Sequence, residues 1–236
     1  MEQVEFNEQD AIRVQLEVWH PGCWVLETSK QVDVGFLGYG VFTRADDRAT
    51  TRYTLYADTY AEIEEAVSLL NDHPAVYKIA EMCSEFNRAP AHSPGNVTRE
   101  LLIENDATTQ ISDAFTSRGF TYAAPGDIYD GTEHWRLFAH MDRETVYERL
   151  DEIRDEEGAD ITVVSISSPR RAEKDPLPVD RLSHRQREIF QLARTRGYYR
   201  QPKAATAGEL AEELGITTST FHEHLHKAEE KLLDLS

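Results

Sequence analysis

The sequence contains only two cysteines, Cys23 and Cys83, and no apolar run of about 18 residues. Two cysteines cannot form the disulfide framework of a small secreted domain. The chain also has no basic segment followed by an apolar one near its start, so we expect neither a membrane span nor a secretory signal. These absences predict a cytoplasmic protein whose thiols are reduced.

Basic residues are scarce as well, with 25 Lys and Arg against 43 Asp and Glu and a net charge of −18. Such a surface stays hydrated at high salt, where screening weakens its self-repulsion, and it favours a halophilic protein over an acidic mesophilic one. The charge is uneven, because residues 170–236 hold 12 basic and 11 acidic side chains. Only this C-terminal segment can approach a phosphate backbone without net repulsion.

The motifs of common enzyme classes are missing too. The chain has no phosphate-binding loop, no glycine-rich dinucleotide fingerprint and no Gly-x-Ser-x-Gly. Its many carboxylates follow the pattern of exposed faces, so pairs of them carry little information. We therefore expect no catalytic residues, no cofactor and no resident metal ion, and hence no enzyme.

The segment from Leu182 to Ser236 has the pattern of a helix-turn-helix. Apolar positions at helical spacing predict a first helix after Leu182, a second over 207–214 and a third from Thr217. Gly215 accepts the positive φ that the turn between the last two helices needs, and the hydroxyls of 217–219 can cap the third helix. This arrangement leaves the first turn of the third helix free to enter a DNA major groove, although some such folds bind only proteins.

The third helix has an apolar stripe at Phe221, Leu225, Ala228 and Leu232, and its histidines lie off this stripe. His222 and His226 are four residues apart and so share a face that is able to hold a metal, but we interpret them as solvated or groove-facing. We predict that DNA is contacted at base edges by the start of the helix and at phosphates by nearby basic residues: Thr218, Ser219, Thr220, His222, Glu223 and His226 in the first set, and Arg185, Arg187, Arg200 and Lys203 in the second.

These segments resemble the helix-turn-helix of bacterio-opsin-activator-type regulators of haloarchaea. The resemblance is carried by Leu182-Ser-His-Arg-Gln-Arg-Glu, Gly197-Tyr-Tyr, Ala207-Gly-Glu-Leu-Ala-Glu-Glu-Leu-Gly-Ile and Phe221-His-Glu-His-Leu-His. They are also similar to sigma-factor DNA-binding regions, but the spacer over 198–205 is longer here. The resemblance covers a quarter of the chain and implies a transcription factor that binds double-stranded promoter or operator DNA. The three histidines at 222, 224 and 226 depart from the usual pattern.

The first 168 residues predict an α+β region made of a pair of ferredoxin-like, ACT-like βαββαβ units. We expect units at 1–87 and 96–168, a Pro-punctuated linker at 169–181 and the helix-turn-helix domain at 182–236. The expected strands are 12–19, 34–43, 50–57 and 76–86, then 97–104, 120–127, 134–139 and 161–167. The expected helices are 59–71, 108–118 and 143–156, and the first unit matches only if 23–31 adds one more.

Paired units of this kind resemble the ligand-sensing domains of many regulators. One recognition helix reads only a few base pairs, so we expect a homodimer assembled mainly through the N-terminal sheets. The N-terminal half is then either a sensor of a small effector or a dimerisation scaffold without a ligand. An adaptor that acts through protein partners without binding DNA is the alternative for the whole chain.

The segment His20-Pro-Gly-Cys-Trp24 is the one local cluster with chemical potential. A His and a Cys on one turn can bind a soft metal ion, or the imidazole can lower the pKa of the thiol. We take His20, Cys23 and Trp24 as candidate sensing residues, for a metal or oxidant at Cys23 or for a metabolite between the two units. His73 and Cys83 are possible further ligands. Buried packing is the alternative for the Cys and the Trp.

Overall fold

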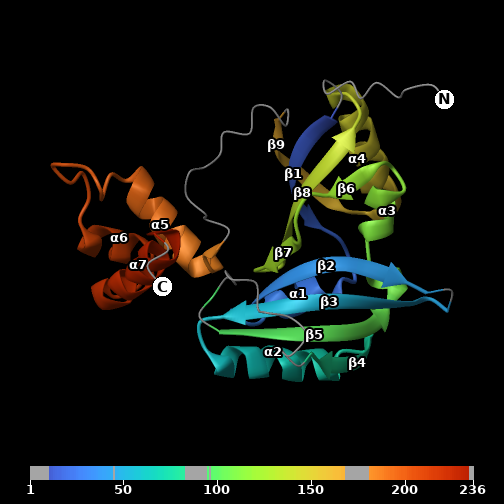
Figure 1. The fold of residues 1–236 in the computed structure, drawn as a ribbon, viewed down its shortest axis with the longest axis horizontal. Helices are drawn as coiled ribbons and strands as arrows, with labels where there is room; N and C mark the ends of the chain where they lie inside the picture. Colours follow the sequence, from blue (N-terminus) through green and yellow to red (C-terminus); the bar gives the residue numbers. More distant parts are fainter. Residues whose placement is uncertain (1–10, 45, 83–94, 96, 168–180, 234–236) are drawn as a thin grey trace. The chain divides into compact units, whose positions relative to one another are not determined.

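The computed structural model describes residues 11–44, 46–82, 95, 97–167 and 181–233 (Figure 1). Contacts divide the chain into two compact units, one made of residues 1–55, 60–83 and 99–173 and a second that contains 174–236 with two short stretches, 56–59 and 84–98. All of the predicted linker but Arg181 lies outside the described residues, and so does Cys83. No helix among the described residues is long and apolar enough to cross a membrane.

An antiparallel sheet dominates the first unit. Its order is β4-β5-β3-β2-β7-β8-β1-β9, and β6 also pairs with β8. Figure 1 shows β2 to β5 together in one half of the sheet and β1, β6, β8 and β9 in the other, with β7 between them. The strands are β1 (Ala11–Trp19), β2 (Gly35–Thr43), β3 (Arg48–Ala57), β4 (Val76–Glu81), β5 (Val97–Asp106), β6 (Phe120–Tyr122), β7 (Gly126–Tyr129), β8 (Thr132–His140) and β9 (Asp160–Ser167).

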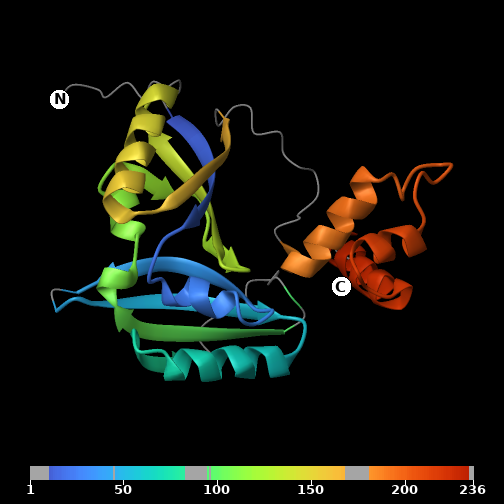
Figure 2. The same ribbon diagram turned by 180° about the vertical axis from the view of Figure 1, so that it is seen from behind.

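Helices pack on this sheet through apolar stripes. The helix α4 (Arg143–Glu157) begins where the Asp142 side chain accepts a hydrogen bond from the Thr145 N–H, and it buries Val146, Leu150 and Ile153. These three side chains join a core with β1, β8 and β9. The remaining helices of the unit are α1 (Trp24–Ser29), α2 (Tyr60–Asp72), the 3-10 turn η1 (Ala107–Thr109) and α3 (Ser112–Thr116). Figure 2 shows the opposite side of the same ribbon.

The first strand of each predicted unit lies in the other half of the sheet. β1 pairs with β8, where Leu16 faces Trp135, and with β9, where Val18 faces Ile161. β5 pairs with β4 and neighbours β3. Two ferredoxin-like units that each consist of one continuous stretch are therefore not confirmed, whereas a mixed fold with a large antiparallel sheet is. Apolar alternation predicts the buried face of a strand and not its partner, so it fits either pairing.

Two further predicted elements are each divided in the structure. The helix expected over 108–118 is divided into η1 and α3, because Gln110 is extended between them. The strand expected over 120–127 is broken into β6 and β7, of which β7 pairs with both β8 and β2. β7 is thus the strand that joins the two halves into one sheet.

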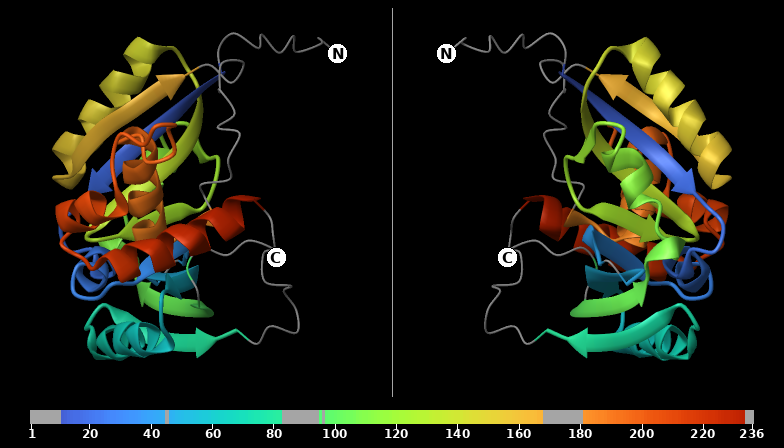
Figure 3. Two further views of the ribbon diagram at one scale, coloured as in Figure 1. Left: turned by 90° about the vertical axis from the view of Figure 1, so that its left-hand side faces the viewer. Right: turned by 90° about the vertical axis from the view of Figure 1, so that its right-hand side faces the viewer.

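The C-terminal unit has the three predicted helices, α5 (His184–Thr195), α6 (Ala207–Glu213) and α7 (Thr218–Leu233), drawn in orange to red in Figure 3. Capping boxes start α5 at Ser183 and α6 at Thr206, and Gly215 has a φ of 66° before α7. The predicted apolar stripe of α7 is buried against α5 and α6 in a core of Leu182, Ile189, Phe190, Ala193, Leu210, Ala211, Phe221, Leu225, Ala228 and Leu232.

Candidate functional site

The start of α7 is fixed to the core on one face and exposed on the other. Thr217 caps it by accepting a hydrogen bond from the Thr220 N–H at 3.1 Å, and the buried Phe221 anchors the first turn to the core. Thr218 and Ser219 are exposed, while Thr220 is half-buried. The first turn therefore presents exposed hydroxyl groups from a helix whose opposite face is buried in the core.

The second and third turns of α7 carry polar side chains that contact one another. The rings of His222 and His226 are stacked, with centroids 5.8 Å apart. His226 Nδ1 lies 3.1 Å from Glu229 Oε2, and Lys227 Nζ donates to Glu223 Oε1 at 2.8 Å. The Lys227 contact lowers the pKa of Glu223, so this predicted base-contacting residue is held as a carboxylate.

The four predicted phosphate contacts differ in their surroundings. Arg200 and Lys203 are exposed, and the Lys203 ammonium lies 3.9 Å from the ring centre of Tyr198. Arg185 is half-buried and forms an ion pair with Glu188 at 2.5 Å. Arg187 is half-buried and donates to the carbonyl of Leu182 at 3.5 Å. Their exposure thus favours Arg200 and Lys203 as phosphate contacts. The hydrogen bond of Arg187 instead helps to hold the start of α5.

A second candidate site lies in the first unit, where a turn joins β1 to α1. Gly22 has a φ of 70°, which reverses the chain after His20 and brings Cys23 to the position before the helix. Both side chains are buried, with His20 6% and Cys23 2% exposed. Trp24 is fully buried, and its ring meets that of Tyr53 edge-on at 5.5 Å. This packing supports a structural role for Trp24.

The third member of this site is Glu133 in β8, which sequence reasoning missed. Its Oε1 lies 3.4 Å from His20 Nε2 and 3.6 Å from Cys23 Sγ. Its Oε2 accepts a 2.6 Å hydrogen bond from Trp135 Nε1. The three side chains are buried and offer ligand atoms that all lie within 4.8 Å of one another. His73, the other possible ligand within the described residues, instead lies 3.2 Å from Glu27 Oε2.

Burial, and to a smaller extent the adjacent Glu133 carboxylate, raise the pKa of Cys23 well above its ordinary value. The free side chain is therefore a thiol that donates weakly to Glu133 and not a thiolate. A buried thiol of this kind reacts slowly with oxidants. The electrostatics of the turn thus give no support to an oxidant acting at Cys23.

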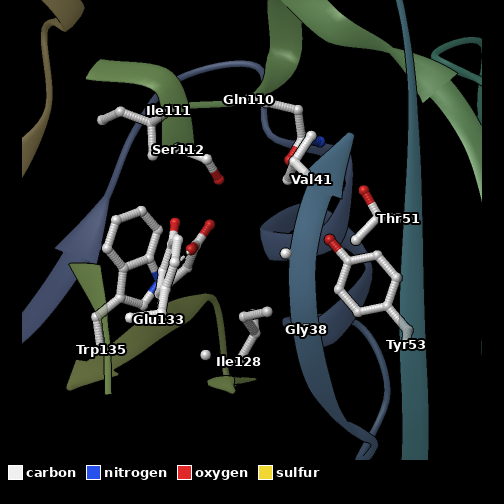
Figure 4. A pocket seen from close by; sticks show the side chains of 13 residues that line it. Gly38, Val41, Thr51, Tyr53, Gln110, Ile111, Ser112, Ile128, Glu133 and Trp135 are labelled. Atoms are coloured by element: carbon white, nitrogen blue, oxygen red, sulfur yellow. Dashed lines mark hydrogen bonds between the residues drawn. The ribbon is translucent and has the colours of Figure 1, made fainter. Parts of the chain in front are cut away.

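Glu133 also lines a pocket together with polar side chains from several elements (Figure 4). Glu133 and Trp135 lie on one side of it, and Tyr53 lies on the other. Burial raises the pKa of Tyr53 and of Tyr122, so both keep their hydroxyl protons. The remaining polar lining comes from Thr51, Gln110 and Ser112. The pocket offers hydroxyl, amide and carboxylate groups to a small polar ligand.

Comparison with known proteins agrees with the helix-turn-helix. Residues 182–234 match the family described as HTH DNA binding domain. The chain is 41% identical over 80 residues to "Transcriptional regulator NarO" of Haloferax volcanii, a match that spans 33% of this chain and 38% of that protein. It is 35% identical over 79 residues to a "Putative transcriptional regulator" of the same organism, across 30% of this chain and 14% of that protein. The chain thus spans well under half the length of either relative.

These matches confirm the predicted resemblance to haloarchaeal helix-turn-helix regulators. A second family, described as HVO_2525_N, N-terminal, matches residues 13–159, which is more than half of the chain and includes His20, Cys23 and Glu133. The chain therefore belongs to the HVO_2525_N family and carries a C-terminal helix-turn-helix DNA-binding domain of the haloarchaeal regulator type.

Proposed function

We propose that this protein is a transcriptional regulator that reads promoter or operator DNA with α7 and has no enzymatic activity. The observation that carries the proposal is the start of α7, where Thr218 and Ser219 are exposed above a buried Phe221. A recognition helix needs this combination, because its first turn must reach base edges while its other face is fixed by the core. The regulator names of the relatives from Haloferax volcanii support it.

In this proposal the hydroxyls of the first turn and the stacked His222 and His226 face the major groove. Hydroxyl and imidazole groups can donate to and accept from base edges. Arg200 and Lys203 supply phosphate contacts, because they are the exposed members of the predicted basic set. Arg185 and Arg187 stay close to the start of α5, where they form part of the support for the interface.

We propose further that the N-terminal half forms a homodimer and senses a signal. The sheet order ends in β4 on one side and β9 on the other. The side chains of Tyr77 in β4 and Val164 in β9 are 49% and 54% exposed. Edge strands with exposed apolar side chains favour pairing between chains. The buried cluster of His20, Cys23 and Glu133 beside a polar pocket supports a sensing role.

The predicted domain organisation, 1–87, 96–168, 169–181 and 182–236, remains part of this proposal in a modified form. The sheet halves β4-β5-β3-β2 and β9-β1-β8-β6 both have the strand order typical of a ferredoxin-like fold, if β1 and β5 are exchanged between two units. We infer that the two units are ferredoxin-like and share their first strands. Such an exchange would make the two units fold together.

A mobility-shift assay with promoter DNA in high-KCl buffer tests the DNA-binding proposal. The parent chain should bind specifically, and the double variant Thr220→Ala, His222→Ala should not, although its circular dichroism stays unchanged. The matched control is Glu230→Gln, an exposed change later in α7 that should bind like the parent. Binding of fragment 1–169 as tight as that of the full chain would show that α7 is not the reading element.

A further inference from the structure

We propose that His20, Cys23 and Glu133 bind one divalent transition-metal ion, with Zn²⁺ the best match, through Nε2, Sγ and Oε1. This site deepens the proposed sensing role and rests on the proposed function only for its effect on DNA binding. It also revises the expectation that the chain holds no metal.

Two of the three separations between the ligand atoms match those around such an ion, and all three lie within 4.8 Å. Tetrahedral Zn²⁺ with sulfur at about 2.3 Å and nitrogen or oxygen at about 2.0–2.1 Å separates its ligand atoms by about 3.3–3.6 Å. Glu133 Oε1 lies 3.4 Å from His20 Nε2 and 3.6 Å from Cys23 Sγ. The mixed set of imidazole, thiolate and carboxylate suits Zn²⁺ and related ions better than Mg²⁺ or Ca²⁺, which prefer oxygen alone.

His20 is the second observation that points to a ligand. Its Nε2 is buried and has no hydrogen-bond partner among the described residues, because its approach to Glu133 lacks hydrogen-bond geometry. A buried polar atom left without a partner costs free energy, so such atoms are rare in folded proteins. A metal ion between Nε2 and Oε1 would remove this cost.

A neighbouring side chain orients the carboxylate. The 2.6 Å hydrogen bond from Trp135 Nε1 engages Oε2 of Glu133 and leaves Oε1 directed at His20 and Cys23. Hydrogen bonds of this kind from outside the ligand set fix the ligands of metal sites and tune their affinity. On binding, the Cys23 thiol proton is released to solvent, and the thiolate and carboxylate charges balance the charge of the ion.

Three protein ligands leave one tetrahedral position open, as in sites that exchange a water molecule for another ligand. Glu133 is the ligand that also lines the pocket with Tyr53, Tyr122 and Ser112 (Figure 4). The fourth ligand is therefore expected to be a water molecule, or an oxygen of a small polar compound that enters this pocket. One site then serves both versions of the sensing hypothesis, metal and metabolite.

Cobalt titration of the full-length, chelator-treated protein tests the site, because a Cys–Co²⁺ bond gives a charge-transfer band in the near ultraviolet. We expect one equivalent of Co²⁺ to produce this band and Zn²⁺ to remove it. Cys23→Ser should abolish the band, whereas Cys83→Ser and the double variant His222→Ala, His226→Ala should keep it. Survival of the band in Cys23→Ser, or its absence from the parent, would overturn the proposal.

Glu133→Gln gives the same test if Cys23→Ser folds poorly, because the amide oxygen can still accept from Trp135. We expect Co²⁺ affinity to fall at least about tenfold in this variant. An unchanged affinity in a folded Glu133→Gln would overturn the assignment of Glu133 as a ligand.

The mobility-shift assay separates this inference from the proposed function. If the site is regulatory, Zn²⁺ changes DNA affinity of the parent by roughly 5- to 150-fold and leaves that of Cys23→Ser unchanged. Metal binding with unaltered DNA affinity would overturn the regulatory role and confirm the site. Metal binding by a chain that binds no promoter DNA would overturn the proposed function and confirm the site.

Discussion

Replacing Glu133 by Gln should have opposite consequences with and without metal, and this contrast probes the site through stability alone. Without metal, the variant loses a charge-assisted hydrogen bond from Trp135 Nε1 and keeps a neutral one. A hydrogen bond to a charged group contributes about 1.5–3 kcal/mol to the free energy of unfolding, and a neutral one contributes about 1 kcal/mol. The new amide N–H can donate to His20 Nε2, which has no partner among the described residues, and one buried charge disappears. We therefore expect a net change of about 1 kcal/mol or less in either direction.

With metal, the parent gains stability that the variant cannot gain. A ligand at 100 times its dissociation constant raises the free energy of unfolding by about 2.7 kcal/mol when it binds only the folded state. For a unit of this size that corresponds to a rise of about 5–10 °C in melting temperature. The Gln side chain offers a neutral amide oxygen in place of a carboxylate, so its response to Zn²⁺ should be close to zero.

Thermal melts followed by circular dichroism at one high KCl concentration, with either a chelator or Zn²⁺, measure both effects. Glu17→Gln is the matched control, because it removes an exposed carboxylate from the neighbouring strand β1 and should respond to Zn²⁺ like the parent. An equal rise in melting temperature for Glu133→Gln and the parent would refute the reasoning. So would a variant that is several kcal/mol less stable in the presence of the chelator.

Other expectations concern the rest of the chain. Leu225→Ala should destabilise the helical unit by about 2–5 kcal/mol in urea unfolding, because it empties a position that is 1% exposed. Lys203→Ala should lower the slope of log affinity against log salt by about 1, whereas Arg187→Ala should lower stability and leave the slope unchanged. The Thr145 N–H lowers the pKa of Asp142, so its contribution to stability is present above the unfolded pKa of about 3.9 and is lost as pH falls through the folded one. Asp142→Ala should therefore make the urea midpoint less sensitive to acid. Light scattering in molar salt should give a dimer, and a monomer with and without DNA would contradict the proposed assembly.

Local signals made the helical unit predictable from the sequence. Its helices begin at Ser183, Thr206 and Thr217, each of which caps its helix with a hydroxyl, and Gly215 supplies the positive φ of the turn between α6 and α7. Each of these signals acts over four residues or fewer, and the apolar periodicity of each helix gives its buried face directly. Nothing in this unit required a choice between distant partners.

The sheet could not be predicted to the same depth, because its order depends on pairings across the chain. β1 is identified as a strand by the alternation of Val14, Leu16 and Val18, all of which are buried. The same alternation would serve a position beside β3, which is where the predicted ferredoxin-like unit requires it. The choice of β8 and β9 is made by contacts more than 100 residues away in the sequence, which local patterns do not encode.

Glu133 is a different case, because the sequence does contain a signal for it. The predicted strand begins at His134, two residues after the start of β8, although Glu133 continues the alternation of Trp135, Leu137 and Ala139 on the buried face of β8. A carboxylate that alternates with three core residues on one face of a strand needs a buried polar partner, because burial of an unpaired charge is costly. The turn at His20 and Cys23 offers such partners, an imidazole and a thiol. An acidic residue on the apolar face of a predicted strand therefore indicates a buried polar site. Its partners are to be looked for among the His and Cys residues that have no other assigned role.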